Sequence, residues 1–497
     1  MKTSLWTLVM EALFTLNLQA FLWMFVGTVL GVFGGFLPGV NATMVLVILL
    51  PLTYSMPLES ALGMLLAAYG AAIFGGSGSA ILLNTPGTGG SAATALDGFA
   101  LTKKGKGNQA LGIASMSSFL GGFISVVILL LLMRPLARFA LRFGPPEYFA
   151  VSIFGVSIIA SVTDNDTIKG IMAGVLGLLL GTVGMSLTGQ LRGTMGNLFL
   201  TGGINTVPAM MGLFALTSAF NLINEKSVMN EGVQHKRNFK EELEGCLITL
   251  KHLPLVIWTA IIGTVIGILP GAGASIACWA AYKESFRFTK NPPKLGTGHY
   301  QGVIAPESAN NAAQGGALIT TFALGIPGSG ASAVLLSALL LHGVTAGPQL
   351  LVQGIDLIIQ PIVLLVISFF VCLVIGLIFE YVVSGVVNIP TKIIAPVIIA
   401  LGMTGSYAFR GAIFDCFTAL VFGILGYIMS KTGYSRVAMV LGLILGKMTE
   451  QELVRTSIRF GGDFSVFFTR PISCVILVVS ILSILYSLVM KLRTSKN

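Results

Sequence analysis

A stretch rich in glycine, alanine and serine occurs twice in this chain, each time among long apolar segments. The first copy runs from Gly70 to Gly98 and the second from Asn311 to Ser337. Equivalent residues lie 241 positions apart, and they are Gly75 and Gly316, Leu83 and Leu324, Pro86 and Pro327, Gly87 and Gly328, Gly89 and Gly330, and Ser91 and Ser332. The duplication predicts two structural repeats, each carrying one copy of the same element.

The composition indicates the environment in which these repeats fold. Hydrophobic residues make up 55% of the 497 residues and charged residues only 10%, whereas soluble globular chains carry about 25% charged residues. Apolar runs long enough to cross a bilayer, about 20 residues each, recur along the chain. We therefore predict an all-α, polytopic integral membrane protein with about 11–13 transmembrane segments. The alternating strands of a transmembrane barrel are absent from the sequence.

The charged residues and cysteines indicate no further chemistry. The net charge of +10 fits lysine and arginine in cytoplasmic loops better than a nucleic-acid partner. The five cysteines are scattered without a CxxC pair, so we expect small core residues and neither disulfides nor a metal site. We divide the chain into a first membrane repeat (1–223), a hydrophilic linker (224–252) and a second membrane repeat (253–497), and we expect the repeats to be inverted.

Each glycine-rich copy contains a Pro-Gly pair that should interrupt a helix or form a re-entrant hairpin. Proline lacks an N–H group and clashes with the preceding turn, and a helix that begins after the break presents free N–H donors and a positive dipole end. Such an end binds anions. The predicted substrate-binding residues are Ser79, Asn84, Pro86, Gly87, Thr88, Gly89 and Ser91 in the first copy, and Pro327, Gly328, Ser329, Gly330 and Ser332 in the second.

Close helix packing is the alternative role for these small residues, because glycine, alanine and serine also line helix contacts in membranes. The matching positions of the two Pro-Gly pairs favour a binding site, since duplicated breaks are typical of secondary transporters. An earlier duplicated pair, Pro38-Gly39 and Pro270-Gly271, predicts either a second set of breaks or helix ends.

Ionisable residues at membrane depth are functional candidates because they are costly there. Glu307, Asn310 and Asn311 offer oxygen ligands for Na⁺ or a carboxyl group for a proton, with Asn41 as a further candidate; a capped interfacial loop is the alternative. Three other sets fit structural roles better. They are Asp97 in an Asp-Gly turn, Arg410 paired with Asp415 on one helix, and Asp164 and Asp166 in a solvated loop.

Three long motifs resemble the large membrane subunit of the tripartite tricarboxylate transporters. They are GGSGSAILLNTPGTGGSAATALDGFALTKKGKGNQALG, FLPGVNATMVLVILLPLTY and IAPESANNAAQGGALITTFALGIPGSGASAVLL. The resemblance implies cation-coupled uptake, through Na⁺ or H⁺, of di- or tricarboxylates across the inner membrane, with an elevator-like mechanism. It also implies a small membrane subunit and an extracytoplasmic solute-binding protein as partners, and Asn84–Ser91 and Gly325–Ser332 as substrate loops. We expect no cofactor apart from a coupling Na⁺, and no enzymatic activity.

Two other functions remain as alternatives. Gly75-Gly76-Ser77-Gly78 matches the GxSG motif of rhomboid-type serine proteases, but a serine nucleophile needs a nearby base. Of the four histidines, His235, His252, His299 and His342, only His342 lies where membrane depth is plausible. No HExxH or Walker A motif occurs. An anion channel would also use a backbone-lined filter, although usually within an oligomeric ring.

Overall fold

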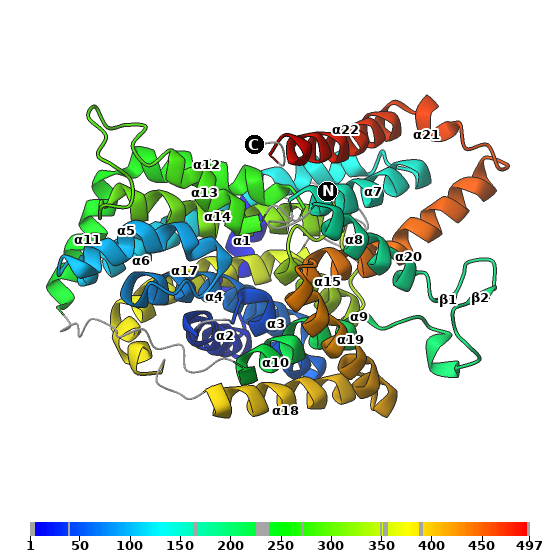
Figure 1. Cartoon of the computed structure of the whole chain (residues 1–497), viewed down its shortest axis with the longest axis horizontal. Helices are drawn as coiled ribbons and strands as arrows, with labels where there is room; N and C mark the ends of the chain where they lie inside the picture. The colour runs from blue at the N-terminus through cyan, green and yellow to red at the C-terminus, as the bar shows by residue number, and fades with distance from the viewer. Residues whose placement is uncertain are drawn as a thin grey trace.

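The structure is a computed structural model that describes residues 5–37, 40–162, 167–224, 238–270, 273–347, 350, 356–386 and 391–494. Helices form almost all of it (Figure 1), and the only strands among these residues are β1 (Gly184–Met185) and β2 (Leu191–Arg192), which pair antiparallel. The prediction of an all-α protein is confirmed. Pro38, Gly39, Asp164, Asp166, His235 and Gly271 lie outside the described residues.

The helices follow the predicted apolar segments closely. Those before the linker are α1 (Leu5–Phe14), α2 (Leu18–Phe36), α3 (Ala42–Leu49), α4 (Leu58–Leu83), α5 (Ala92–Lys103), α6 (Gly107–Ala140), α7 (Pro145–Val162), α8 (Thr167–Gly181), α9 (Thr206–Met210) and α10 (Thr217–Asn224). Those after it are α11 (Phe239–Lys251), α12 (Leu253–Ile268), α13 (Gly273–Lys283), α14 (Gln301–Leu324), α15 (Gly330–Leu341), α17 (Asp356–Val386), α18 (Thr391–Arg410), α19 (Ile413–Thr432), α20 (Arg436–Arg459), α21 (Val466–Thr469) and α22 (Pro471–Thr494).

Six helical spans among the described residues are long and apolar enough to cross a membrane. The count becomes seven if α11 and α12, which meet at a bend of 78°, are taken as one broken span. This is below the 11–13 crossings that we expected, because helix breaks divide several apolar segments. Four further apolar helical segments are shorter, at Ala42–Ser55, Ile168–Gly181, Gly330–Leu341 and Pro471–Leu485. The polytopic character is confirmed.

Glycines bring equivalent helices of the two halves into the same kind of contact. α2 packs on α4, and α12 packs on α14. A Cβ atom on Gly35 would lie 2.0 Å from the Ala72 carbonyl oxygen, and one on Gly267 would lie 2.3 Å from the Ala313 carbonyl oxygen. Ala72 and Ala313 are 241 residues apart, so the sequence repeat is also a repeat of helix packing. Small residues permit this close approach.

The equivalent helices α4 and α14 run in opposite directions where they meet. Glu307 on α14 contacts Ser77 on α4, whereas Gln314, two turns later on α14, donates to the carbonyl oxygen of Leu66, which is earlier on α4. The residue number of the contacting partner on α4 therefore falls as the residue number on α14 rises, and this order defines an antiparallel pair. These equivalent helices of the two halves are therefore inverted relative to one another.

Other helices surround these central pairs. α5, α6 and α11–α14 gather on one side of the molecule, and α7, α8, α20 and α22 pack together on the other (Figure 1). α18 and α19 pack on the segment 206–224, which contains a π-helical stretch at Met211–Leu216. Arg410 and Asp415 form an ion pair, N to O 2.5 Å, across the turn between α18 and α19 and not along one helix as predicted.

Candidate functional site

Both Pro-Gly loops interrupt helices in the same way. Asn84 caps the end of α4 with φ 54°, and Gly325 caps the end of α14 with φ 73°; both residues adopt the left-handed conformation that stops a helix. Asn84 and Gly325 are equivalent in the repeat. The chain then turns back into α5 and α15, so that each half carries a helical hairpin. We call Pro86–Ser91 the first tip and Pro327–Ser332 the second tip.

Reciprocal caps begin the second helix of each hairpin. The Ser329 N–H group donates to Ser332 Oγ at 2.8 Å, and the Ser332 N–H group donates to Ser329 Oγ at 3.1 Å. Thr88 and Ser91 form the matching capping box in the first tip. Serine and threonine in this pattern satisfy two of the donors that a helix start leaves unpaired. The predicted residues Thr88, Ser91, Ser329 and Ser332 therefore shape the tips.

Several donors at the tips remain. Within the described part of the chain, the backbone N–H groups of Gly89, Gly90, Gly330 and Ala331 have no hydrogen-bond acceptor. Each pair lies at the positive end of a 12-residue helix. The two tips thus present the type of donor that binds a carboxylate.

Each tip contacts the opposite half. A Cβ atom on Gly89 would lie 2.5 Å from Ser275 Oγ, and one on Gly330 would lie 2.9 Å from Thr43 Oγ1. Tyr69 Oη lies 2.9 Å from Ser329 Oγ. None of these three hydroxyl groups was predicted from the sequence. The repeat could have indicated two of them, because Thr43 and Ser275 each follow an earlier Pro-Gly pair at the same distance.

Of the remaining residues predicted to bind substrate, some pack inside the protein and others are exposed. A Cβ atom on Gly87 would lie 2.2 Å from the Gly35 carbonyl oxygen, and one on Gly328 would lie 2.7 Å from the Ala317 Cα atom. These two glycines therefore pack the tips against their own halves. Ser79 and Pro327 are buried, and Ser79 donates to the Gly76 carbonyl oxygen, whereas Asn84 and Pro86 are exposed.

A cavity of about 420 Å³ opens beside the first tip. Gly89 and Ser275 line it, together with Trp279 and Lys283 one and two turns further along α13. This volume is many times the ~30 Å³ of one water molecule. The cavity joins the N–H groups of the tip to an indole ring and a cationic side chain, which suits a small organic anion.

Glu307 lies at the junction of four helices and is fully buried. Its carboxylate accepts hydrogen bonds from Ser77 Oγ at 2.5 Å, Thr94 Oγ1 at 2.5 Å and Ser118 Oγ at 3.0 Å. These hydroxyl groups come from α4, α5 and α6. The carboxylate therefore connects the first hairpin to α14, the helix that precedes the second tip.

Further polar atoms on α14 lie close to Glu307 in sequence. Asn310 Oδ1, Asn311 Oδ1 and Gln314 Oε1 are buried and have no hydrogen-bond partner in the described residues. Buried polar atoms usually have partners, so these oxygens are available to a ligand. Asn311 and Ser118 also line a cavity of about 10 Å³, near the lower limit for a bound water. Uncharged oxygens of this kind suit a hard cation such as Na⁺.

Two other predicted candidates have structural partners. Asn41 caps α3, since its side-chain oxygen accepts from the Met44 N–H group at 3.0 Å. Asp97 lies within α5 and not in a turn. Its carboxylate accepts from Tyr282 Oη at 2.7 Å and from the N–H groups of Gly296, Gly298 and His299. Asp97 thus fastens the loop before α14 to the first hairpin.

The protease motif lacks its expected base in the described residues. Ser77 is fully buried and donates to Glu307. The His342 ring contacts the carbonyl oxygens of Ala338 and Met56, and the His252 ring contacts the carbonyl oxygen of Ile248 and the Gln301 amide. No described histidine is paired with Ser77.

A pair of equivalent helices that cross in opposite directions, each ending in a break whose tip meets the other half, is typical of membrane transporters. A family model described as "Tripartite tricarboxylate transporter TctA family" matches residues 21–441. The chain belongs to this family, so the resemblance stated above is confirmed, and membership makes it a subunit of a transporter that has other subunits.

Two proteins from Agrobacterium vitis are similar to this chain. One is described as an uncharacterized 52.8 kDa protein in the TAR-I ttuC' 3' region; it is 34% identical over 479 residues, which cover 96% of this chain and 94% of the relative. The other is described as an uncharacterized protein in the TAR-II ttuC' 3' region; it is 31% identical over 235 residues, which cover 47% of this chain and 97% of the relative. No solved structure gives a significant match.

Proposed function

We propose that this chain is the substrate-translocating subunit of a cation-coupled transporter that takes up di- or tricarboxylates. The observation that carries the proposal is the pair of capped tips, each with two free N–H groups and each in contact with a hydroxyl group of the opposite half. A ligand with two or more carboxylate groups could bind both halves at once. Neither tip contains a lysine or arginine, so backbone and hydroxyl donors would bind the anion.

Glu307 and the neighbouring amide oxygens are the proposed coupling site. Asn310, Asn311 and Gln314 would supply neutral ligands to Na⁺, and Glu307 would supply either the negative charge for Na⁺ or the group that takes up H⁺. Asn310 Oδ1 would lie 1.9 Å from a Cβ atom on Gly90, which means that it packs against the first tip. A cation bound here would therefore favour one position of that tip, and this is the differential interaction that coupling requires.

The inverted arrangement of α4 and α14 supports alternating access, since exchanging the conformations of two inverted halves reverses the side that is open. We propose an elevator-like movement of the two hairpins against the surrounding helices. We also propose an inner-membrane location, with an extracytoplasmic solute-binding protein that delivers the carboxylate and a small membrane subunit that completes the complex.

Uptake into vesicles tests this proposal. The chain would be reconstituted with the small subunit, and labelled di- and tricarboxylates would be added with the binding protein while Na⁺ and pH gradients are varied separately. We expect saturable uptake that needs the binding protein and one of the two gradients. Flux that rises linearly with anion concentration and needs neither gradient nor binding protein would indicate a channel.

A further inference from the structure

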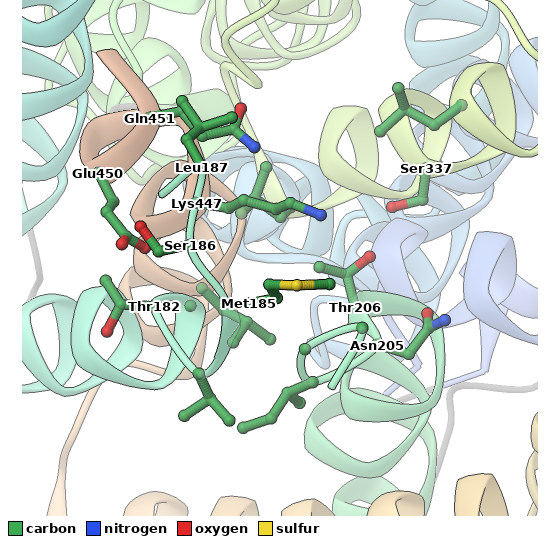
Figure 2. Close-up of a pocket in the computed structure, with 18 of the residues that line it drawn as sticks. Thr182, Met185, Ser186, Leu187, Asn205, Thr206, Ser337, Lys447, Glu450 and Gln451 are labelled. Atoms are coloured by element: carbon green, nitrogen blue, oxygen red, sulfur yellow. The ribbon is translucent and has the colours of Figure 1, made fainter. Parts of the chain in front are cut away.

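Two adjoining cavities share walls formed by α15 and α20. Their volumes are about 260 and 620 Å³. The segment 181–206 completes the smaller cavity, and residues 143–145 and Tyr148, together with Leu324 and Gly325 before the second tip, complete the larger one. Both are lined by Leu336 and Leu340 of α15 and by Ile444, Lys447 and Gln451 of α20. Figure 2 shows Lys447 crossing the smaller cavity towards Ser337 and Thr206. We call the two together the α20 cavity.

Lys447 carries a charge in the α20 cavity that is not matched by an acidic partner among the described residues. Among the described residues it has no hydrogen bond or ion pair, although two carboxylates line the cavity. Glu450 pairs with Arg192 of β2 at 2.5 Å, and Glu452 pairs with Arg455 at 2.5 Å. Arg459 also lines the larger part. With both carboxylates matched by arginines, Lys447 and Arg459 leave the lining with an excess of positive charge.

Neutral donors surround this charge. Gln451 lies one turn after Lys447 on the same face of α20, and its side chain has no partner in the described part of the chain. On the opposite wall, the Asn205 oxygen accepts from the Val207 N–H group at 3.1 Å, which leaves the Asn205 amide N–H groups for a ligand. Thr206 adds a hydroxyl group beside it (Figure 2).

We propose that the α20 cavity is a second anion site, in which a small di- or tricarboxylate binds with one carboxylate on Lys447 and Gln451 and another on Asn205 and Thr206 of the opposite wall (Figure 2). A lysine with neutral donors is a sufficient carboxylate site in a partly enclosed cavity.

The position of α15 relates the α20 cavity to the second tip. Gly330 begins α15, and Ser337 of the same helix lines the cavity. At 1.5 Å per residue the two positions are about 10 Å apart along the helix. An anion in the cavity would therefore be close to the tip without touching it. The inference rests on the proposed function only for the class of anion.

Equilibrium binding tests the proposal without transport. Citrate would be titrated calorimetrically into the full chain in nanodiscs of phosphatidylcholine, which carries no net charge, so that anionic lipid headgroups cannot compete. We expect two classes of site in the wild type. Lys447→Gln should weaken one class at least tenfold, Lys447→Arg should retain it, and Lys290→Gln, which changes an exposed loop lysine, should match the wild type.

An isotherm of Lys447→Gln that equals the wild type would overturn the site, as would a wild type that binds no citrate. Equal thermal transitions of the lysine variants would show that the loss is not unfolding. The binding experiment and the uptake experiment can fail independently of one another. Binding that depends on Lys447 without any vesicle uptake would contradict transport alone, and uptake with binding insensitive to Lys447 would contradict the second site alone.

Discussion

Glu307 combines a structural and a chemical role at a single residue. Its carboxylate accepts three hydroxyl hydrogen bonds, so it fixes α4, α5 and α6 around α14. The free oxygens of Asn310, Asn311 and Gln314 lie on the same helix within two turns. A buried carboxylate is costly in a membrane protein, and three neutral donors compensate for this cost only in part. A bound cation would supply the missing charge.

Replacing Glu307 separates the two roles. In Glu307→Gln one carboxylate oxygen becomes an NH₂ group, which faces hydroxyl donors. We expect a loss of about 1–3 kcal/mol in the free energy of unfolding, together with uptake that no longer responds to the coupling gradient. Uptake against Na⁺ concentration and against pH is the measurement. Glu244→Gln, which alters an exposed carboxylate, is the control. A lower stability with an unaltered ion dependence would limit Glu307 to structure.

The tip glycines allow a test of substrate contact that Gly87 and Gly328 do not, because those two pack against backbone. In Gly89→Ala the new Cβ atom would meet Ser275 Oγ at 2.5 Å, and in Gly330→Ala it would meet Thr43 Oγ1 at 2.9 Å. We expect each variant to raise the apparent KM for the carboxylate about tenfold, or 1.4 kcal/mol. Gly402→Ala, whose Cβ atom would have an ordinary contact at 3.4 Å, is the control. Normal KM values in both variants would argue against the tips as the site.

At this scale the sequence predicted the positions of the helix breaks better than the partners of the side chains around them. The Pro-Gly pairs located the helix breaks, since proline and glycine act locally. The partners of the tips, Thr43, Tyr69 and Ser275, come from the opposite half, and local pattern carries little information on such contacts. The pairing of Asp97 with the loop before α14 was missed for the same reason.

The helix pairs α2–α4 and α12–α14 form the repeated element of the molecule. Each depends on glycines that bring two backbones into contact. The sequence revealed the repeat because the small residues recur at constant separation. The sequence could not give the number of membrane spans. A helix that is broken part-way is as apolar as a full span, but it is too short to cross the membrane.

Equivalent glycines in these pairs should have equivalent effects. Gly35→Val and Gly267→Val each insert a branched side chain where even a Cβ atom would lie 2.0 or 2.3 Å from a carbonyl oxygen. Overpacking costs about 1–3 kcal/mol, so both variants should unfold at lower temperature, and by similar amounts. Thermal unfolding in detergent, followed by size-exclusion chromatography, is the measurement. A large effect in one half only would show that the two pairs do not have the same role.

For the whole molecule, the question is whether the first tip moves relative to the opposite half. The distance from an ideal Cβ atom on Gly89 to the Ser275 Cβ atom is 3.6 Å, within the 3.5–4.5 Å that disulfides span. The double variant Gly89→Cys, Ser275→Cys should therefore cross-link on oxidation. Cys278 would first be replaced by alanine, because its Sγ atom lies 3.9 Å from the Gly89 carbonyl oxygen.

Oxidation of this double variant should stop uptake, and reduction should restore it, because the disulfide joins the tip to α13 across the mouth of the 420 Å³ cavity. Each single cysteine variant under the same oxidant shows what the substitutions alone do. The extent of cross-linking would be measured by mass spectrometry of the peptides. Complete cross-linking with undiminished uptake would mean that the first hairpin and α13 move as one body. The hairpin and α13 would then have to move together against the outer helices. Among these, α7, α8, α20 and α22 pack mainly on one another.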